Sequence, residues 1–329
     1  MRSIVIMAAS ILVLLLLLLF MAPTFSNSEA IETLPVSGYH RLYLGFDVIV
    51  GAQKTIRSFY GSLEAQLGPF TINYANSTTG DIPALELNPY AWTKVANIIF
   101  LDQPVGTGFS YSKTWEASLS TDTLSAQQTY SFLIQWLLDH PKFLSNPLYI
   151  TGDSYSGIII PLIVRKIYDG LESGIEPRLN MKGYVVGNPM TADTYANENN
   201  QVIFAYRMGL LSHNLYQGTI TTWDRCNDQI PYIYNVQSTV DYHRSFTNKS
   251  YRVLIYSGDH DMGIPHIGTE EWIESLKVGV VDDWRPWFVE DQVAGYTKKY
   301  SQNEYELTYA TVKVIKTTFS YINLMVQQH

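Results

Sequence analysis

Cysteine is almost absent from this sequence of 329 residues, in which Cys226 is the only one. A single cysteine cannot form an intramolecular disulfide, so on count alone Cys226 is a buried thiol. Charged residues are also sparse, at 16% of the chain, and the net charge of -8 argues against nucleic acid as a partner. Hydrophobic residues make up 46% of the chain, which excludes a disordered composition and indicates a globular protein.

Hydrophobic runs of membrane length are lacking except near the N-terminus, where one run extends from residue 4 to residue 21. Arg2 precedes this run, and small residues such as Ala22 and Ser28 follow it. This order is typical of a secretory signal peptide, which we assign to residues 1–28. An uncleaved signal anchor is the alternative, because the run is longer than a typical signal core. After cleavage we expect no membrane contact.

Two N-glycosylation sequons, at Asn76 and Asn248, agree with a secretory route. The cell exterior and the vacuole both fit this route. No repeat and no low-complexity linker divides the rest of the sequence, so we expect residues 29–329 to form a single domain.

The most informative motif is the segment Gly-Asp-Ser-Tyr-Ser-Gly from Gly152 to Gly157. It resembles the G-x-S-x-G pattern, with Ser156 in place of the second glycine and Gly157 directly after it; that pattern places a serine on a tight turn between a strand and a helix. The residues before it predict a short buried strand over 147–151, and those after it have helical apolar spacing over 158–168. Such a turn exposes the serine hydroxyl at the sheet edge, where Ser154 can act as a nucleophile if a base is near.

Strands and helices alternate along the chain, which predicts an α/β sheet. Continuous apolar runs predict further buried strands over 95–102, 179–187 and 252–256. The segment 121–140 predicts a long amphipathic helix with one apolar face formed by Leu124, Tyr130, Leu133, Leu137 and Leu138. Ser154 and Asp261 both follow predicted strands, and functional sites in α/β sheets lie beyond such carboxyl ends.

Five sequence blocks resemble plant serine carboxypeptidase-like proteins, a branch of the α/β-hydrolase fold. They occur in the family's order and lie at residues 97–111, 152–157, 183–189, 257–262 and 282–296. The resemblance implies an α/β-hydrolase fold with a central, mostly parallel sheet. It also implies serine-type chemistry on a peptide C-terminus or an acyl ester, with no cofactor and no metal.

The resemblance implies a role for each residue of the serine turn. Ser154 would form an acyl-enzyme, the backbone N–H of Tyr155 would supply half of the oxyanion hole, and Asp261 would orient a catalytic histidine. Asp153 occupies the acidic position that the family uses to bind the substrate carboxylate. The alternative for Asp153 is a turn residue that caps the following helix.

The sequence departs from the family in three places. The family's Gly-x-Gly-His turn does not follow Lys313, so the catalytic histidine and the closing helix are missing from their expected positions. A Trp-Leu-x-Gly-Gly-Pro-Gly-Cys-Ser loop and its core strand are missing before Leu67, and with them the second oxyanion donor. A lid insertion is missing after Tyr216. The family comparison therefore makes Cys226 half of a disulfide whose partner is gone, and the domain is truncated after about residue 313.

Two hypotheses remain open from the sequence. One is a serine carboxypeptidase or acyltransferase with impaired activity, and Asp153 together with Trp284 to Trp287 is more similar to the acyltransferase branch. The other is a non-catalytic remnant or a mis-spliced product. We do not expect His260 or His266, the histidines nearest to Asp261, to replace the missing base. The remaining internal histidines are interpreted as surface or packing residues: His40, His140, His213 and His243.

Overall fold

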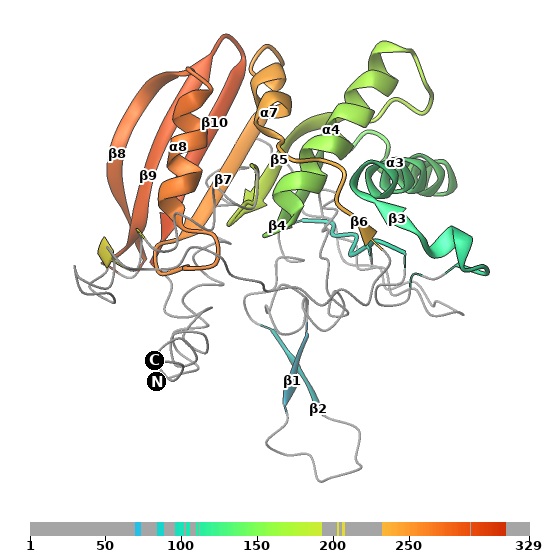
Figure 1. Ribbon diagram of the computed structural model, residues 1–329, viewed down its shortest axis with the longest axis horizontal. Helices are drawn as coiled ribbons and strands as arrows, with labels where there is room; N and C mark the ends of the chain where they lie inside the picture. Colours follow the sequence, from blue (N-terminus) through green and yellow to red (C-terminus); the bar gives the residue numbers. More distant parts are fainter. Residues whose placement is uncertain are drawn as a thin grey trace.

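The computed structural model describes residues 70–73, 84–88, 96–101, 103–105, 110, 112–192, 203, 206–207, 232–289 and 291–313. Its centre is a six-stranded sheet in the order β4-β5-β7-β10-β9-β8 (Figure 1). The first four strands of this order are parallel, and β9 and β8 are antiparallel to their neighbours. The strand bounds are β4 Leu148–Asp153, β5 Met181–Gly187, β7 Arg252–Gly258, β8 Gly279–Val289, β9 Gln292–Gln302 and β10 Tyr305–Val312.

Smaller elements accompany the central sheet. Two separate strand pairs are present, one antiparallel and one parallel: β1 Phe70–Asn73 with β2 Ala84–Leu87, and β3 Ser120–Thr121 with β6 Tyr232–Ile233. The described helices are α3 Asp122–Asp139, α4 Ser156–Glu172, α7 Val240–Phe246 and α8 His266–Ser275, with short 3-10 turns η3 Glu116–Ser118 and η4 Pro141–Phe143.

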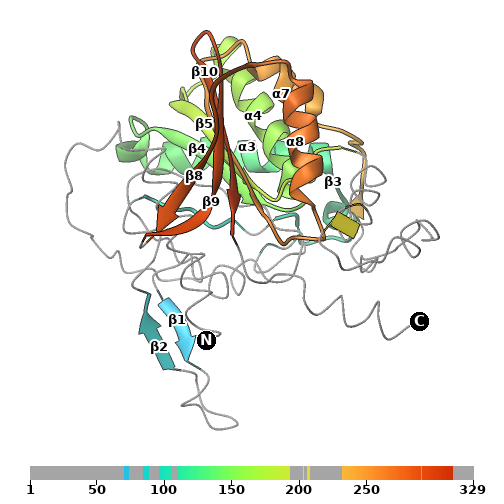
Figure 2. The ribbon, with the colours of Figure 1, turned by 90° about the vertical axis from the view of Figure 1, so that its left-hand side faces the viewer.

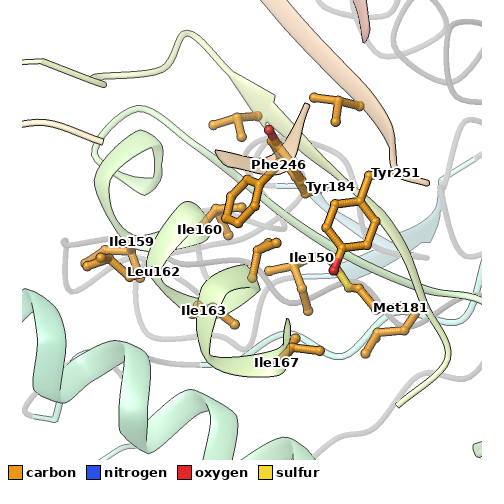
Figure 3. Packing of buried hydrophobic residues seen from close by; sticks show 14 of the residues in the cluster. Ile150, Ile159, Ile160, Leu162, Ile163, Ile167, Met181, Tyr184, Phe246 and Tyr251 are labelled. Atoms are coloured by element: carbon orange, nitrogen blue, oxygen red, sulfur yellow. The ribbon is translucent and has the colours of Figure 1, made fainter. Parts of the chain in front are cut away.

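The described helices pack on one face of the sheet. Every second residue of each strand points to this face and meets the helices there. Figure 2 shows the sheet edge-on with α4, α7 and α8 on the same side. The buried cluster beneath them contains Ile150 of β4, Tyr184 of β5 and Ile160 and Ile163 of α4 (Figure 3). Each fully buried aliphatic side chain contributes about 1.5–3 kcal/mol, so this layer is the main source of cohesion.

The opposite face carries a second buried cluster. Tyr149, Val185 and Leu254, each one residue out of phase with the first layer, pack there with Ala96 and Ile98. Both faces of β4, β5 and β7 are therefore buried, which explains the nearly continuous apolar runs of these strands.

The strands predicted over 147–151, 179–187 and 252–256 are confirmed as β4, β5 and β7. The strand predicted over 95–102 is wrong in extent, because only Ile98 and Ile99 show isolated bridge pairing in the described part of that segment. Their burial is nevertheless confirmed.

The helix predicted over 121–140 is confirmed as α3, but two members of its predicted apolar face are wrong. Leu133 and Leu137 are buried, whereas Leu124 and Leu138 are 40% and 53% exposed. The buried face instead continues at three- and four-residue spacing through smaller or polar side chains and one tryptophan: Asp122, Ser125, Ala126, Thr129 and Trp136. A face chosen by hydrophobicity alone misses these residues.

Pro161 lies inside α4, where it cannot donate a hydrogen bond to the carbonyl of Gly157. The hydroxyl of Thr239 donates to that carbonyl at 2.8 Å instead. Thr239 is fully buried and immediately precedes α7. The proline is thus accommodated because a neighbouring segment satisfies the acceptor that it leaves open.

Several predictions from the sequence lie outside the described residues. They concern the signal peptide at 1–28, the sequon at Asn76, the missing loop before Leu67, the missing insertion after Tyr216, Cys226, and the segment after Lys313. Within the described part of the chain, none of the helices has the length and apolarity needed to cross a membrane.

Candidate active site

Ser154 lies on the turn between β4 and α4, and its side chain is exposed. Its φ of 58° is in the left-handed region, which costs a residue with a Cβ atom about 1–2 kcal/mol. Three backbone hydrogen bonds hold this conformation. The Ser154 N–H donates to the Gly187 carbonyl at 2.8 Å, and the Ser154 carbonyl accepts from Gly157 and Met190 at 3.0 Å each. The predicted strand–turn–helix context of the serine is therefore confirmed.

Gly157 permits the close approach on which this turn depends. A Cβ atom at this position would lie 2.3 Å from the backbone oxygen of Met190. The same Met190 backbone donates to the Ser154 carbonyl, so any side chain at residue 157 would separate the two segments.

Asp261 follows β7 and presents a carboxylate with a fixed orientation. Its Oδ1 accepts from the backbone N–H groups of Gly263 at 2.7 Å and Ile264 at 3.3 Å. Its Oδ2 accepts from the side-chain amide of Asn188 at 2.7 Å. Because β4 and β7 are separated only by β5, Ser154 and Asp261 lie at the same edge of the sheet, as predicted.

Asn188 is a site residue for which the sequence predicted no role. It follows β5 with a φ of 40° and, besides binding Asp261, accepts from the Gly258 N–H at 3.4 Å. It therefore links the carboxyl ends of β5 and β7. The available signal was its position directly after a buried strand that neighbours the serine strand.

The carboxyl end of β10 lies beside the Asp261 loop. The carbonyl of Val312 accepts from the Asp259 N–H at 3.0 Å, and the Lys313 N–H donates to the Ala294 carbonyl at 2.8 Å. The chain thus leaves β10 next to the loop that carries the predicted acid. Residues 314–317, where the family's histidine turn was expected, lie outside the described residues.

Asp153 is the last residue of β4 and lies opposite Gly187 in the strand pairing. Tyr155 directly precedes α4 and its side chain makes no capping hydrogen bond, so the alternative of Asp153 as the residue that caps this helix stays a prediction. The Tyr256 ring packs directly against Gly187. A Cβ atom added at Gly187 would lie 2.4 Å from the Tyr256 hydroxyl. Burial raises the pKa of Tyr256, and the charge of Asp153 raises it further, so this hydroxyl stays protonated beside the carboxylate.

The described histidines form no hydrogen bond with the serine. His260 is exposed, and its Nδ1 lies 2.6 Å from Oδ1 of Asp259. His266 is the first residue of α8 and is half-buried, and this burial lowers its pKa. His140 stacks on Trp136, in agreement with a packing role. Within the part of the chain that the structure describes, the Ser154 side chain makes no hydrogen bond to any of them.

His243, a residue of α7, confirms its predicted packing role and is fully buried. Asn248, the second sequon asparagine, is exposed in the turn after α7 and is sterically open to modification. Across the described ranges, histidine, cysteine and carboxylate side chains form no cluster of three that could hold a metal ion.

An exposed serine in a left-handed turn after a parallel strand, with an oriented carboxylate two strands away, is the arrangement typical of the α/β-hydrolase fold. A sequence profile of the serine carboxypeptidases matches residues 57–221 and 217–314. The chain belongs to the serine carboxypeptidase family.

Relatives and solved structures agree with this assignment. Serine carboxypeptidase-like 17 of Arabidopsis thaliana is 37% identical over an alignment that covers 78% of this chain and 75% of that protein. Serine carboxypeptidase-like 10 of the same plant is 36% identical, with 78% and 76% covered. The crystal structure of a prohormone-processing carboxypeptidase, Kex1, from Saccharomyces cerevisiae has a TM-score of 0.64 at 17% identity, covering 81% of this chain and 78% of that one. This likeness shows the α/β-hydrolase fold.

Proposed function

We propose that the site at the ends of β4, β5 and β7 is built for serine-type acyl transfer. Ser154 is the nucleophile, and the Tyr155 N–H is one of two oxyanion donors. Asp261 orients the imidazole that accepts the serine proton, and Asp153 binds the substrate carboxylate. In the family's complete site, a histidine takes the serine proton as the oxygen of Ser154 attacks the carbonyl, this proton departs with the leaving group, and water or another acceptor then releases the acyl group.

The observation that carries this proposal is the strained, exposed conformation of Ser154. A left-handed, non-glycine residue persists only where the surroundings hold it, and such residues cluster at functional sites. Because β5 lies between β4 and β7, a strand spacing of about 4.8 Å separates their ends by about 10 Å, so the proposal requires a group between Ser154 and Asp261 to couple them.

The missing base limits the activity of this chain. No Gly-x-Gly-His follows Lys313 in the sequence, and an enzyme without one member of its triad retains only about 10³–10⁴-fold acceleration over water. We therefore propose impaired catalysis by a domain that is incomplete after about residue 313. A non-catalytic remnant or mis-spliced product is the second candidate, supported by the same missing histidine.

Labelling with a fluorophosphonate probe tests the nucleophile. We expect slow labelling that is confined to Ser154 and abolished by Ser154→Ala. Ser173→Ala, which removes an exposed serine at the far end of α4, is the matched control and should label like the wild type. If the folded wild-type chain is not labelled, Ser154 is not a nucleophile and the remnant hypothesis holds.

The substrate class divides peptidase from acyltransferase. Asp153 stands directly before Ser154, at a position where the true peptidases of the family usually carry glutamate. By similarity to the acyltransferase branch, this favours acyl esters such as glucose esters over C-terminal peptide bonds. Measuring acyl release from an acyl-glucose ester and from a blocked dipeptide, with Ser154→Ala as the blank, separates the two. Faster turnover of the dipeptide would contradict the acyltransferase assignment.

We also propose a secretory location, in the cell exterior or the vacuole, with residues 1–28 removed. Glycosylation at Asn76 and Asn248 follows from this location. Treatment of the expressed chain with an N-glycosidase should lower its apparent mass, and Asn248→Gln should remove part of that change. A chain without glycan after expression in a secretory host would contradict the proposal.

A further inference from the structure

Asp122 is a carboxylate that the acyl-transfer scheme does not use. It is the first residue of α3 and is fully buried. Its Oδ1 accepts from the hydroxyls of Tyr155 at 2.6 Å and Tyr232 at 2.7 Å. Its Oδ2 accepts from the backbone N–H groups of Asn235 at 2.8 Å and Val236 at 3.0 Å. All four donors come from segments distant in sequence.

Burying a carboxylate is costly unless it is paired or fully hydrogen-bonded. Among the described residues, Asp122 has no cationic partner. The hydrogen bonds from its four donors therefore offset the free-energy cost of burying its charge. Its position in the first turn of α3 adds the favourable field of a helix N-terminus. An arrangement with this many convergent donors specifies one geometry, because displacement of any partner leaves buried charge unsatisfied.

The contacts of Asp122 join three parts of the chain. The first is the start of α3, where β3 pairs with β6 (Figure 1). The second is the segment 232–236. In this segment the side-chain amide of Asn235 also donates to the hydroxyl of Thr123, with 2.9 Å between Nδ2 and Oγ1. The third is the serine turn, through Tyr155. Tyr155 also packs edge-on against Tyr232 and Tyr234, with ring centroids 6.3 and 5.6 Å apart.

We propose that Asp122 is a positioning residue for the nucleophile turn. It acts through Tyr155, whose backbone N–H is the oxyanion donor in the proposed function on which this inference rests. Tyr155 immediately follows the strained Ser154 and directly precedes α4, where its side chain makes no capping hydrogen bond to the helix. Anchoring the Tyr155 ring to a buried carboxylate fixes the peptide between residues 154 and 155, and therefore the direction of its N–H.

Two tyrosine variants provide a matched test, because both hydroxyls donate to the same Asp122 oxygen and both rings are half-buried. Tyr155→Phe removes the hydrogen bond that ties the serine turn to Asp122, whereas Tyr232→Phe leaves that hydrogen bond in place. We expect Tyr155→Phe to slow fluorophosphonate labelling of Ser154 by about tenfold and Tyr232→Phe by less than about twofold, as for loss of one charge-assisted hydrogen bond. Asp122→Asn should slow labelling like Tyr155→Phe, and adding Tyr155→Phe to it should cause little further change.

Hydrogen exchange provides a readout that does not require a reactive serine. We expect exchange in a peptide covering residues 150–160 to accelerate by about tenfold in Tyr155→Phe and by less than about twofold in Tyr232→Phe. Equal effects of both variants on this peptide, or none in Tyr155→Phe, would overturn the positioning role. If the wild type is not labelled but the exchange difference is present, the acyl-transfer proposal fails while the positioning of the turn by Asp122 holds.

Discussion

The buried His243 should make the stability of this protein fall steeply below neutral pH. Burial lowers its pKa from 6.5 to about 3. Its Nδ1 lies 2.7 Å from the Tyr184 hydroxyl, and its Nε2 has no hydrogen-bond partner among the described residues. Protonation would place a second N–H and a positive charge in the core against Trp272, whose ring centroid is 4.6 Å away.

The size of the effect follows from proton linkage. The unfolded chain binds a proton on this histidine near pH 6.5, whereas the folded chain does so only near pH 3. The stabilisation is therefore fully present above pH 6.5 and is lost progressively as the pH falls toward 3. Between pH 7 and pH 5 the free energy of unfolding falls by about 2 kcal/mol. This value depends only on the pKa of His243 in the unfolded chain, as long as its pKa in the folded chain is below about 4.

Urea unfolding followed by tryptophan fluorescence at pH 7, 6 and 5 measures this loss. His243→Gln removes the titrating ring but retains every carboxylate, so we expect the wild type to lose about 2 kcal/mol more than the variant over this range. Ile163→Val, in the same core, is the control: it should lower the free energy of unfolding by about 0.5–1.5 kcal/mol at each pH without changing the pH dependence. Equal pH dependence in the wild type and His243→Gln would show that burial of this ring does not couple folding to protonation.

Two further predictions concern the serine turn and α4. Gly157→Ala should destabilise the protein by about 1–3 kcal/mol and abolish labelling of Ser154, because its Cβ would lie 2.3 Å from the Met190 oxygen. Gly279→Ala, whose Cβ would meet its nearest atom at 3.6 Å, should change the urea midpoint little, and equal effects would contradict this account. Thr239→Val should cost about 1–3 kcal/mol, because it leaves the buried Gly157 carbonyl without a donor; Thr239→Ser, which keeps the hydroxyl, should cost less. Chemical denaturation measures both, and an unchanged Thr239→Val would show that another group satisfies the carbonyl.

The sequence predicted those elements whose signal is local. Continuous apolar runs predicted β4, β5 and β7, and the pattern around Ser154 predicted a strand, a turn and a helix in the right order. The extent of the segment 95–102 and the apolar face of α3 were predicted less well. Hydrophobicity identified Leu124 and Leu138 as inward-facing, whereas the helix buries Asp122 and Thr129 because partners on other segments satisfy them.

The residues of the candidate site were likewise predicted only in part from the sequence. Short contiguous patterns were enough to place Ser154 on its turn and Asp261 after its strand, and to identify the family of the chain. The sequence also established that no Gly-x-Gly-His follows Lys313. The folded chain alone revealed that Asn188 holds Asp261 and that Asp122 holds Tyr155, since these contacts join residues 73 and 33 positions apart. The packing of strands and helices brings such polar groups together, and their hydrogen bonds carry no signal in the local sequence.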